Sequence, residues 1–238
     1  MRLILFDLDG TLLTAGGIGR RSTRHALESI FGTSGNLDTF YPGGRTQEAI
    51  FSDTLADAGF SEREYLAKRD QLYQVFLDNF KKNLAEGDFQ IDQLPGASRL
   101  IDYLRGNEDY ALGLVTGNHE VIANLKLQAA GLDPGYFLGG AYGHESADRS
   151  ELVPLGKSRV EEVSGFQFPG YYTIVIGDTT RDVLSARSVG ATSFALTSGT
   201  DSREMLLGSG PDSVFDNLEE VLERFRFLDG RTGGIDGI

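Results

Sequence analysis

The chain has 238 residues, of which 40% are hydrophobic and 24% charged, and its formal net charge is −13. A chain of this length forms one large or two small domains and buries a hydrophobic core. The acidic charge argues against nucleic acid or an anionic membrane as a partner, because no basic patch supplies phosphate contacts. The sequence contains no cysteine and three histidines, which excludes disulfides, thiolate metal sites and a cysteine nucleophile.

The N-terminal residues run directly into an apolar segment, without the basic and cleavable regions of a secretory signal. No apolar run approaches the roughly 20 residues that span a membrane. We therefore expect a cytoplasmic protein that binds neither membrane nor nucleic acid. The sequence does not define the oligomeric state.

Three short apolar runs share one design, in which a buried strand is followed by a polar residue and then by a helical pattern. The runs and the polar residues after them are 3–6 with Asp7, 112–115 with Thr116, and 174–177 with Asp178. Two weaker strands are expected over 192–196 and 213–215. Strands that alternate with helices predict an α/β fold with a Rossmann-like parallel sheet. Because ligands bind beyond the carboxyl ends of such strands, the three polar residues are expected to meet at one site.

The segment between the first two of these strands is helical in pattern. Helices are predicted over 21–31, over 46–58 and after a capping box formed by Ser61 and Glu64. This pattern predicts a helical cap of residues 17–90, inserted into an α/β core of residues 1–16 and 91–238. The hinges are expected at Gly16-Gly17 and at 94–96, and the glycine-rich tail from Asp229 onward is expected to be disordered.

Two carboxylates, Asp7 and Asp9, stand where the first strand ends, and Gly10 allows a sharp turn after them. Acidic groups at the end of a buried strand are costly unless they meet a cation, and Mg²⁺ suits hard carboxylate oxygens. Asp178 and Asp182 are spaced to share one face of a starting helix, which also suits a metal site. The structural alternatives are an acidic turn for the first pair and helix capping for the second.

Two polar segments are candidates for binding an anion. Thr116, Gly117 and Asn118 combine a hydroxyl with backbone N–H groups at the start of a helix, although ordinary helix capping fits the same residues. Arg45 follows two glycines in the expected cap and could contact a substrate carboxylate or phosphate, or simply precede a capped helix. Arg20 and Arg21 are interpreted as surface charges, and the three histidines as structural or exposed.

The run Asp7-Leu8-Asp9-Gly10-Thr11-Leu12 resembles the first motif of the haloacid dehalogenase-like (HAD) phosphohydrolases. The resemblance implies that Asp7 is the nucleophile that forms an aspartyl-phosphate. It implies that Asp9 is the general acid and base, and that its backbone carbonyl also binds Mg²⁺. The family's second motif is similar to the segment at Thr116, whose hydroxyl would bind the phosphoryl group, and its fourth motif is similar to the segment from Asp178 to Asp182.

The third family motif is a basic residue, and here the sequence departs from the common Lys-Pro form. Arg149 stands at a suitable distance before Asp178, and its guanidinium can bridge two oxygens. Lys157 is the alternative, although its position is typical of a solvated helix. We favour Arg149.

The helical cap and the Pro95-Gly96 turn are most similar to the phosphoglycolate phosphatase and β-phosphoglucomutase-like branch of the family. The resemblance implies a Mg²⁺-dependent phosphomonoester hydrolase acting on a small phosphorylated metabolite. A phosphomutase and a non-catalytic phosphate-binding regulator are the alternatives, while Asp9 disfavours a haloacid dehalogenase. The sequence does not identify the substrate.

Overall fold

The computed structural model describes residues 1–230. Within this part of the chain, one sheet contains six parallel strands in the order β5-β4-β1-β6-β7-β8. In chain order the strands are β1 (Arg2–Phe6), β4 (Tyr110–Thr116), β5 (Gly139–Tyr142), β6 (Thr173–Gly177), β7 (Thr192–Leu196) and β8 (Ser213–Phe215). The chain builds outward from β1 to β5 and then returns to build the other side from β6. The strand order therefore reverses at β1, and the predicted α/β fold is confirmed.

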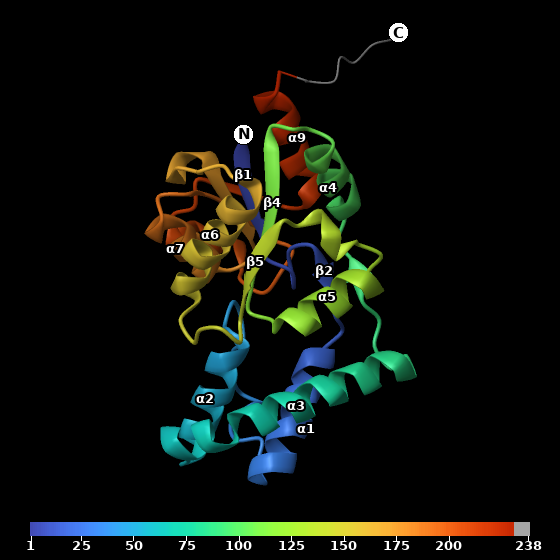
Figure 1. Cartoon of the computed structure of the whole chain (residues 1–238), viewed down its shortest axis with the longest axis vertical. Helices are drawn as coiled ribbons and strands as arrows, with labels where there is room; N and C mark the ends of the chain where they lie inside the picture. Colours follow the sequence, from blue (N-terminus) through green and yellow to red (C-terminus); the bar gives the residue numbers. More distant parts are fainter. Residues whose placement is uncertain (231–238) are drawn as a thin grey trace.

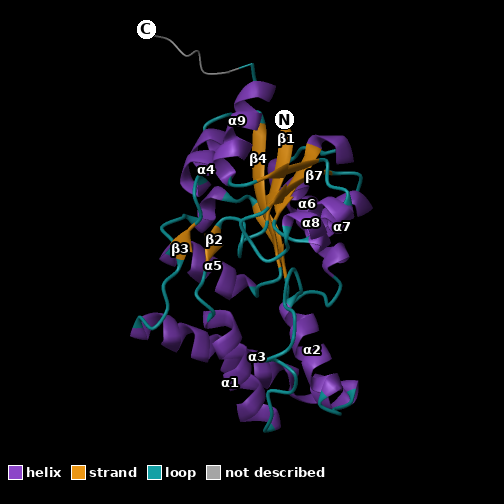
Figure 2. Ribbon diagram, turned by 180° about the vertical axis from the view of Figure 1, so that it is seen from behind, coloured by secondary structure: helices purple, strands orange, loops and turns teal. Residues whose placement is uncertain are grey.

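Alternating side chains of β1 form a core on each face of the sheet. Ile4 and Phe6 join one apolar cluster, and Leu3 and Leu5 join the other. The helices α4 (Ala97–Arg105), α5 (Glu120–Ala129) and α9 (Leu218–Leu228) contribute to the first cluster, whereas α6 (Leu152–Ser164) and α7 (Thr180–Ser188) contribute to the second (Figure 2). The helix α8 (Arg203–Ser209) packs beside α7. Short 3-10 helices are η1 (Pro134–Tyr136), η2 (Arg149–Glu151) and η3 (Gly170–Tyr172).

Three helices form a separate layer beyond one end of the sheet (Figure 1). They are α1 (Ile18–Phe31), α2 (Gln47–Asp57) and α3 (Glu62–Glu86). The predicted capping box starts α3, because the Ser61 hydroxyl accepts from the Glu64 N–H while the Glu64 carboxylate accepts from the Ser61 N–H. The ring of Phe51 from α2 packs edge-on against Tyr73 and Phe76 of α3.

A short antiparallel ribbon marks the place where the chain leaves the core and returns to it. Its strands are β2 (Leu13–Thr14) and β3 (Asp92–Gln93). Gly17 starts α1 with a φ of 89°, a conformation that a side chain would disfavour. The division at residues 17 and 90 remains a prediction, which this ribbon supports.

Two features differ from the sequence expectations. The edge strand β5 was not predicted, because Gly139 and Gly140 give it little of the β-branched character that marks a strand. Asp229 is ordered and accepts hydrogen bonds from Tyr103 and Tyr110, whereas residues 231–238 of the predicted tail lie outside the described residues. Among residues 1–230, no helix has the length and apolar character needed to cross a membrane.

Candidate active site

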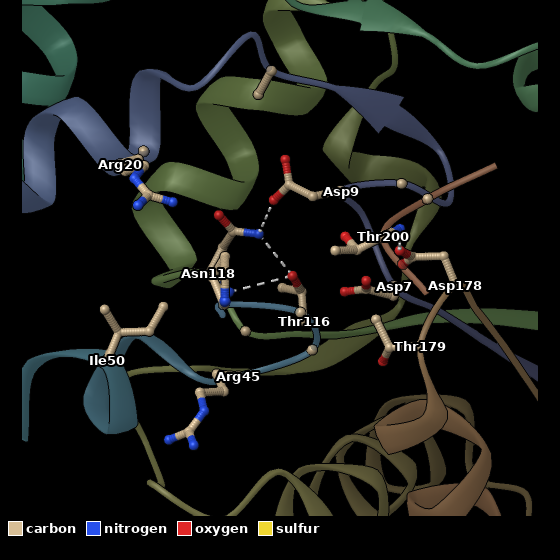
Figure 3. A pocket seen from close by; sticks show the side chains of 18 of the residues that line it. Asp7, Asp9, Arg20, Arg45, Ile50, Thr116, Asn118, Asp178, Thr179 and Thr200 are labelled. Atoms are coloured by element: carbon tan, nitrogen blue, oxygen red, sulfur yellow. Dashed lines mark hydrogen bonds between the residues drawn. The ribbon is translucent and has the colours of Figure 1, made fainter. Parts of the chain in front are cut away.

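The reversal of strand order at β1 brings three polar strand ends together (Figure 3). Asp7 follows β1, Thr116 ends the neighbouring β4, and Asp178 follows β6 on the other side. The Asp7 N–H still bonds to the Ile176 carbonyl, at 3.0 Å, so the sheet holds the Asp7 backbone rigidly. Strand topology thus produces the meeting of residues that the sequence pattern predicted.

Asp7, Asp178 and Asp182 form a buried acidic cluster, in which one carboxylate oxygen of each lies within 4.8 Å of the others. Asp178 is held by the Thr200 N–H, which bonds to its Oδ2 at 2.8 Å, and more weakly by the Thr11 hydroxyl at 3.4 Å from its Oδ1. The cluster has the donor set and spacing that a hard divalent cation requires.

The Asp182 carboxylate accepts more hydrogen bonds than those of Asp7 and Asp178. Its Oδ2 accepts from the N–H and hydroxyl of Thr179, closing the capping box that starts α7. Its Oδ1 accepts from Nη2 and Nε of Arg149, at 2.5 and 3.1 Å. The N-cap of α7 is Thr179 and not Asp178, the residue that the capping alternative had named, while Asp182 is the expected acid of the first turn. The capping box already occupies one of the Asp182 oxygens.

Arg149 lies in the wall of the site, because η2 carries its side chain inward to Asp7. Its Nη2 is 3.1 Å from Asp7 Oδ1, and its Nη1 also donates to the Gly44 carbonyl at 3.2 Å. Lys157, the alternative basic residue, instead pairs with Glu161 on the same helix at 2.6 Å. The structure thus places Arg149, and not Lys157, against the expected nucleophile.

Burial of the acidic cluster shifts the pKa of its carboxylates. Burial is the largest cause that raises the pKa of Asp7 to about 6, with Asp182 adding to the shift and Arg149 opposing it. Burial, followed by the charge of Asp7, raises the pKa of Asp178 well above its usual range. A single guanidinium does not compensate three buried carboxylates, so a divalent cation fits the electrostatics as well as the geometry.

Asp9 stands apart from the acidic cluster. Its carboxylate is 43% exposed and bonds to Lys126 Nζ at 2.6 and 2.8 Å and to Asn118 Nδ2 at 2.7 Å. The Asp9 side chain is therefore no part of the acidic cluster, and its backbone carbonyl stays the predicted metal contact. Lys126 was missed by the sequence analysis, although one feature pointed to it: it occupies the apolar face of α5, together with Ile122 and Leu127.

The segment predicted to bind an anion lies between Asp9 and Asp7. The fully buried hydroxyl of Thr116 accepts from the Asn118 side chain at 2.8 Å and from its N–H at 3.3 Å. Gly117 lies against the cap, because a Cβ there would stand 2.1 Å from the Arg45 carbonyl oxygen. The glycine therefore permits a close approach of the cap backbone to the core.

The cap lies over the site, and cap and core together line a cavity of about 530 Å³ that is partly open to solvent. Backbone N–H groups at the start of α2 bind core carbonyls, with Gln47 N bonding to Gly117 O and Glu48 N to Gly143 O, each at 2.8 Å. Arg45 and Arg20 enter the cavity wall from the cap (Figure 3). Arg20 is exposed, as expected of a surface charge, and from the first turn of α1 it also lines the cavity.

One hydrogen-bond donor of the Arg45 side chain has no partner. Its Nη1 forms an ion pair with Asp53, and its guanidinium lies over the Phe40 ring, 4.7 Å from the centroid. Its Nε is buried and has no hydrogen-bond partner. A buried donor without a partner is costly, so an anionic ligand at this position would be favourable.

A second polar network joins the cap helices to one another and to the core. Glu48 of α2 accepts from Arg69 at 2.7 Å and from the hydroxyls of Tyr65 and Tyr73 at 2.7 and 2.9 Å. Arg69 also donates to the carbonyl of His144 in the core, at 2.7 Å. No local sequence pattern indicates this network, because its members come from segments that are distant along the chain.

Two of the three histidines lie at the same seam. The His119 and His144 rings stack with centroids 4.1 Å apart, and Tyr73 of the cap lies 5.5 Å from His119. Burial is the main cause that lowers the pKa of both rings, for His119 to about 4. Both imidazoles are therefore neutral near neutral pH and serve the packing between cap and core.

The fold and site define a hydrolase of a known type. A family model described as haloacid dehalogenase-like hydrolase matches residues 1–190, and a second, HAD-hydrolase-like model matches residues 163–221. The chain belongs to the haloacid dehalogenase-like hydrolase family, which confirms the resemblance of its motifs.

Similar proteins agree with this assignment. The chain is 38% identical over 234 residues to a phosphoglycolate phosphatase of Vibrio vulnificus (strain CMCP6), covering 94% of this chain and 95% of that protein. It is 23% identical over 226 residues to the pyrophosphatase PpaX of Bacillus pumilus (strain SAFR-032), covering 92% and 94%. A solved structure of a Pseudomonas syringae hydrolase shares the fold, with a TM-score of 0.71, 20% identity and coverage of 96% and 99%.

Proposed function

We propose that this protein is a Mg²⁺-dependent phosphomonoester hydrolase that acts through an aspartyl-phosphate on Asp7. The observation that carries the proposal is the position of Asp7. Its carboxylate belongs to the buried acidic cluster, contacts Arg149, and faces the covered cavity between core and cap. A rigid carboxylate beside a cation site, with little room for bulk water, is suited to attack phosphorus.

The residues around Asp7 supply the remaining contacts of a phosphoryl group. The Thr116 hydroxyl and the Asn118 amide line the cavity beside Asp7 and Asp9 (Figure 3). The backbone at Gly117 and the Arg149 guanidinium line it too, and the two lie close together. Donors fixed in a buried site stabilise charge that develops in the transition state. We therefore assign phosphoryl binding to Thr116 and Asn118, and charge stabilisation to Arg149.

The metal would be held by Asp7 and Asp178, with the Asp9 backbone carbonyl as a further ligand. Asp182 would contribute directly or through a water, because Thr179 and Arg149 already occupy its oxygens. When bound, Mg²⁺ neutralises the negative charge of the phosphoryl group and of the carboxylates around it. The raised pKa of Asp178 supports this assignment, since a nearby cation favours the ionised form.

Asp9 is proposed as the general acid and base. Its exposed carboxylate faces the cavity at the side away from the acidic cluster, where a leaving alcohol would stand. It would protonate that oxygen and then take a proton from the water that hydrolyses the aspartyl-phosphate. This side chain also argues against dehalogenation, which requires no acid at this position.

The substrate is proposed to be a small phosphorylated metabolite. A cavity of about 530 Å³ that the cap covers has room for a small molecule and excludes a folded macromolecule. The unpartnered Nε of Arg45 is proposed to bind a polar group of the substrate beyond the phosphate. A cytoplasmic location belongs to the same proposal, as the place where such metabolites occur.

The test is phosphate release from a panel of small phosphomonoesters, with Mg²⁺ and with a chelator. The names of the relatives recommend phosphoglycolate and pyrophosphate as members of the panel. Release that requires both Mg²⁺ and Asp7, measured beside Asp7→Asn, would support the proposal. Equal release by Asp7→Asn would refute it, and phosphoryl transfer between two positions of a sugar phosphate would indicate the phosphomutase.

A further inference from the structure

Lys126 is a buried cation at a position where a helix would ordinarily carry an apolar residue. It projects from the middle of α5, on the face that packs against the core, and only 4% of its side chain is exposed. Removing an ammonium from water is unfavourable unless hydrogen bonds and an opposite charge compensate. The position therefore requires an explanation beyond the packing of α5.

All three N–H donors of Lys126 have partners at the edge of the cavity. Its Nζ bonds to Oδ1 and Oδ2 of Asp9, at 2.8 and 2.6 Å, and to Oδ1 of Asn118 at 2.7 Å. The Asn118 amide then donates to Asp9 Oδ2 at 2.7 Å and to the Thr116 hydroxyl at 2.8 Å. These bonds form a closed network in which both oxygens of Asp9 are held from the side of α5.

We propose that Lys126 is a positioning residue that fixes the Asp9 carboxylate at the leaving-group side of the cavity. This inference rests on the proposed function of the site. Asp9 is attached to the loop that follows β1, and nearly half of its side chain is open to the cavity. Without Lys126, the carboxylate would rotate about its side-chain bonds, and the Asn118 amide alone would restrain it. Lys126 therefore acts through Asp9 and not on the phosphoryl group.

Asp9, which Lys126 would position, takes part in two chemical steps. In the first, a carboxylate oxygen of Asp7 attacks phosphorus, the bond from phosphorus to the leaving oxygen breaks, and Asp9 gives its proton to that oxygen. In the second, Asp9 takes a proton from water as the water oxygen attacks phosphorus, and the bond from Asp7 to phosphorus breaks. Misplacement of Asp9 slows both steps for an alkyl phosphate, but only the second for an ester whose leaving group needs no proton.

The experiment uses p-nitrophenyl phosphate, whose aryl oxide leaves readily, and follows the first turnovers of Lys126→Met with Mg²⁺. We expect a rapid release of p-nitrophenolate equal to the concentration of active sites, followed by turnover that is about 10²–10⁴-fold slower than in the wild type. The amplitude of the rapid phase counts the correctly folded sites. Lys126→Gln, which retains a donor, should show the same two phases with a smaller loss, and exposed Lys82→Met should behave as the wild type.

The double variant with Asp9→Asn tests whether Lys126 acts through Asp9. If it does, the double variant should turn over as slowly as Asp9→Asn alone and no more slowly, because the two losses are not additive. Losses that multiply, or a variant in which both phases fall in proportion, would show a merely structural role and overturn the inference.

The outcome also separates this inference from the proposed function. A wild type that releases no phosphate in an Asp7-dependent way would overturn the proposed function, and the role of Lys126 with it. A wild type that is active through Asp7, beside a Lys126→Met variant with the same time course, would overturn only the role of Lys126.

Discussion

The Arg149 guanidinium lies 3.1 Å from the Asp7 carboxylate, and the two side chains are only 5% and 7% exposed. A second carboxylate, that of Asp182, binds the same guanidinium at 2.5 Å. Nη2 of Arg149 therefore binds both the expected nucleophile, Asp7, and Asp182 in the first turn of α7. This arrangement makes the basic residue part of the support of the site as well as of its chemistry.

Replacement of Arg149 should reduce both activity and stability. Arg149→Met leaves two buried carboxylates without their partner, so we expect a loss of about 3–5 kcal/mol in the free energy of unfolding. Phosphate release by the folded fraction should fall by at least about 10²-fold, since a fixed donor to the phosphoryl group is lost. Urea unfolding and steady-state kinetics measure the two effects.

Lys157→Met is the matched control, because Lys157 forms a partly buried pair with Glu161 within α6 and does not bind the acidic cluster. It should stay within about 1 kcal/mol of the wild type and retain its activity. An inactive Lys157→Met beside an active Arg149→Met would reverse the assignment of the basic residue.

The two acidic residues near α7 should differ in metal affinity. Asp178→Asn should weaken Mg²⁺ binding strongly, because this carboxylate is held by only one short hydrogen bond and is free to bind a cation. Asp182→Asn should weaken it less, since its oxygens already accept from Thr179 and Arg149. Isothermal titration with Mg²⁺ measures both affinities, and a larger effect of Asp182→Asn would contradict the proposed ligand set.

The stacked histidines should make the cap seam sensitive to acid. Burial lowers the pKa of His119 to about 4 in the folded protein, whereas an unfolded chain has the ordinary value of 6.5. Between these values the unfolded chain binds a proton and the folded chain does not. Stability that is present above pH 6.5 is therefore lost progressively as the pH falls toward about 4.

The variant His119→Asn tests this dependence, because asparagine can still accept from the Val121 N–H at the start of α5. We expect the loss of unfolding free energy between about pH 7 and about pH 5 to be smaller in this variant than in the wild type. Urea unfolding at the two pH values provides the comparison. An identical loss in both proteins would show that His119 does not carry the acid sensitivity.

The Glu48 network should stabilise the packing of α2 against α3. Glu48→Gln removes the charge that Arg69, Tyr65 and Tyr73 bind, so we expect a loss of about 1–3 kcal/mol in the free energy of unfolding. Glu86→Gln is the control, since Glu86 makes only an exposed pair with Lys82 at 3.8 Å. Equal stability of the two variants in urea would refute a structural role for the network.

The sequence predicted the parts of the site that depend on strand ends. Asp7, Thr116 and Asp178 each follow a strongly apolar run, and parallel topology then requires that they meet. The helices of residues 17–90 were also visible, because caps and periodicity are local properties. Local patterns thus specified both the sheet and the position of the acidic cluster.

The parts that the sequence did not reveal depend on contacts between distant segments. Lys126 and Arg20 stand on helices whose orientation over the cavity is set by packing, so no local sequence pattern indicates that either residue lines it. The edge strand at Gly139 and Gly140 has little strand propensity of its own, and β4 provides its hydrogen bonds. Asp7 and Asp9 were both candidates for the metal site, yet the Asp9 carboxylate binds Lys126 and lies outside the acidic cluster.

The measurement that tests the central proposal most directly is the mass of the peptide that contains Asp7. The protein would be mixed with Mg²⁺ and the best substrate of the panel, quenched in acid during turnover, digested and analysed by mass spectrometry. The account predicts a phosphoryl group on Asp7. With p-nitrophenyl phosphate, whose leaving group needs no proton, the phosphorylated fraction should grow in Asp9→Asn, because that variant forms the intermediate but hydrolyses it slowly. Sustained phosphate release with no phosphoryl group on Asp7 in either protein would contradict it.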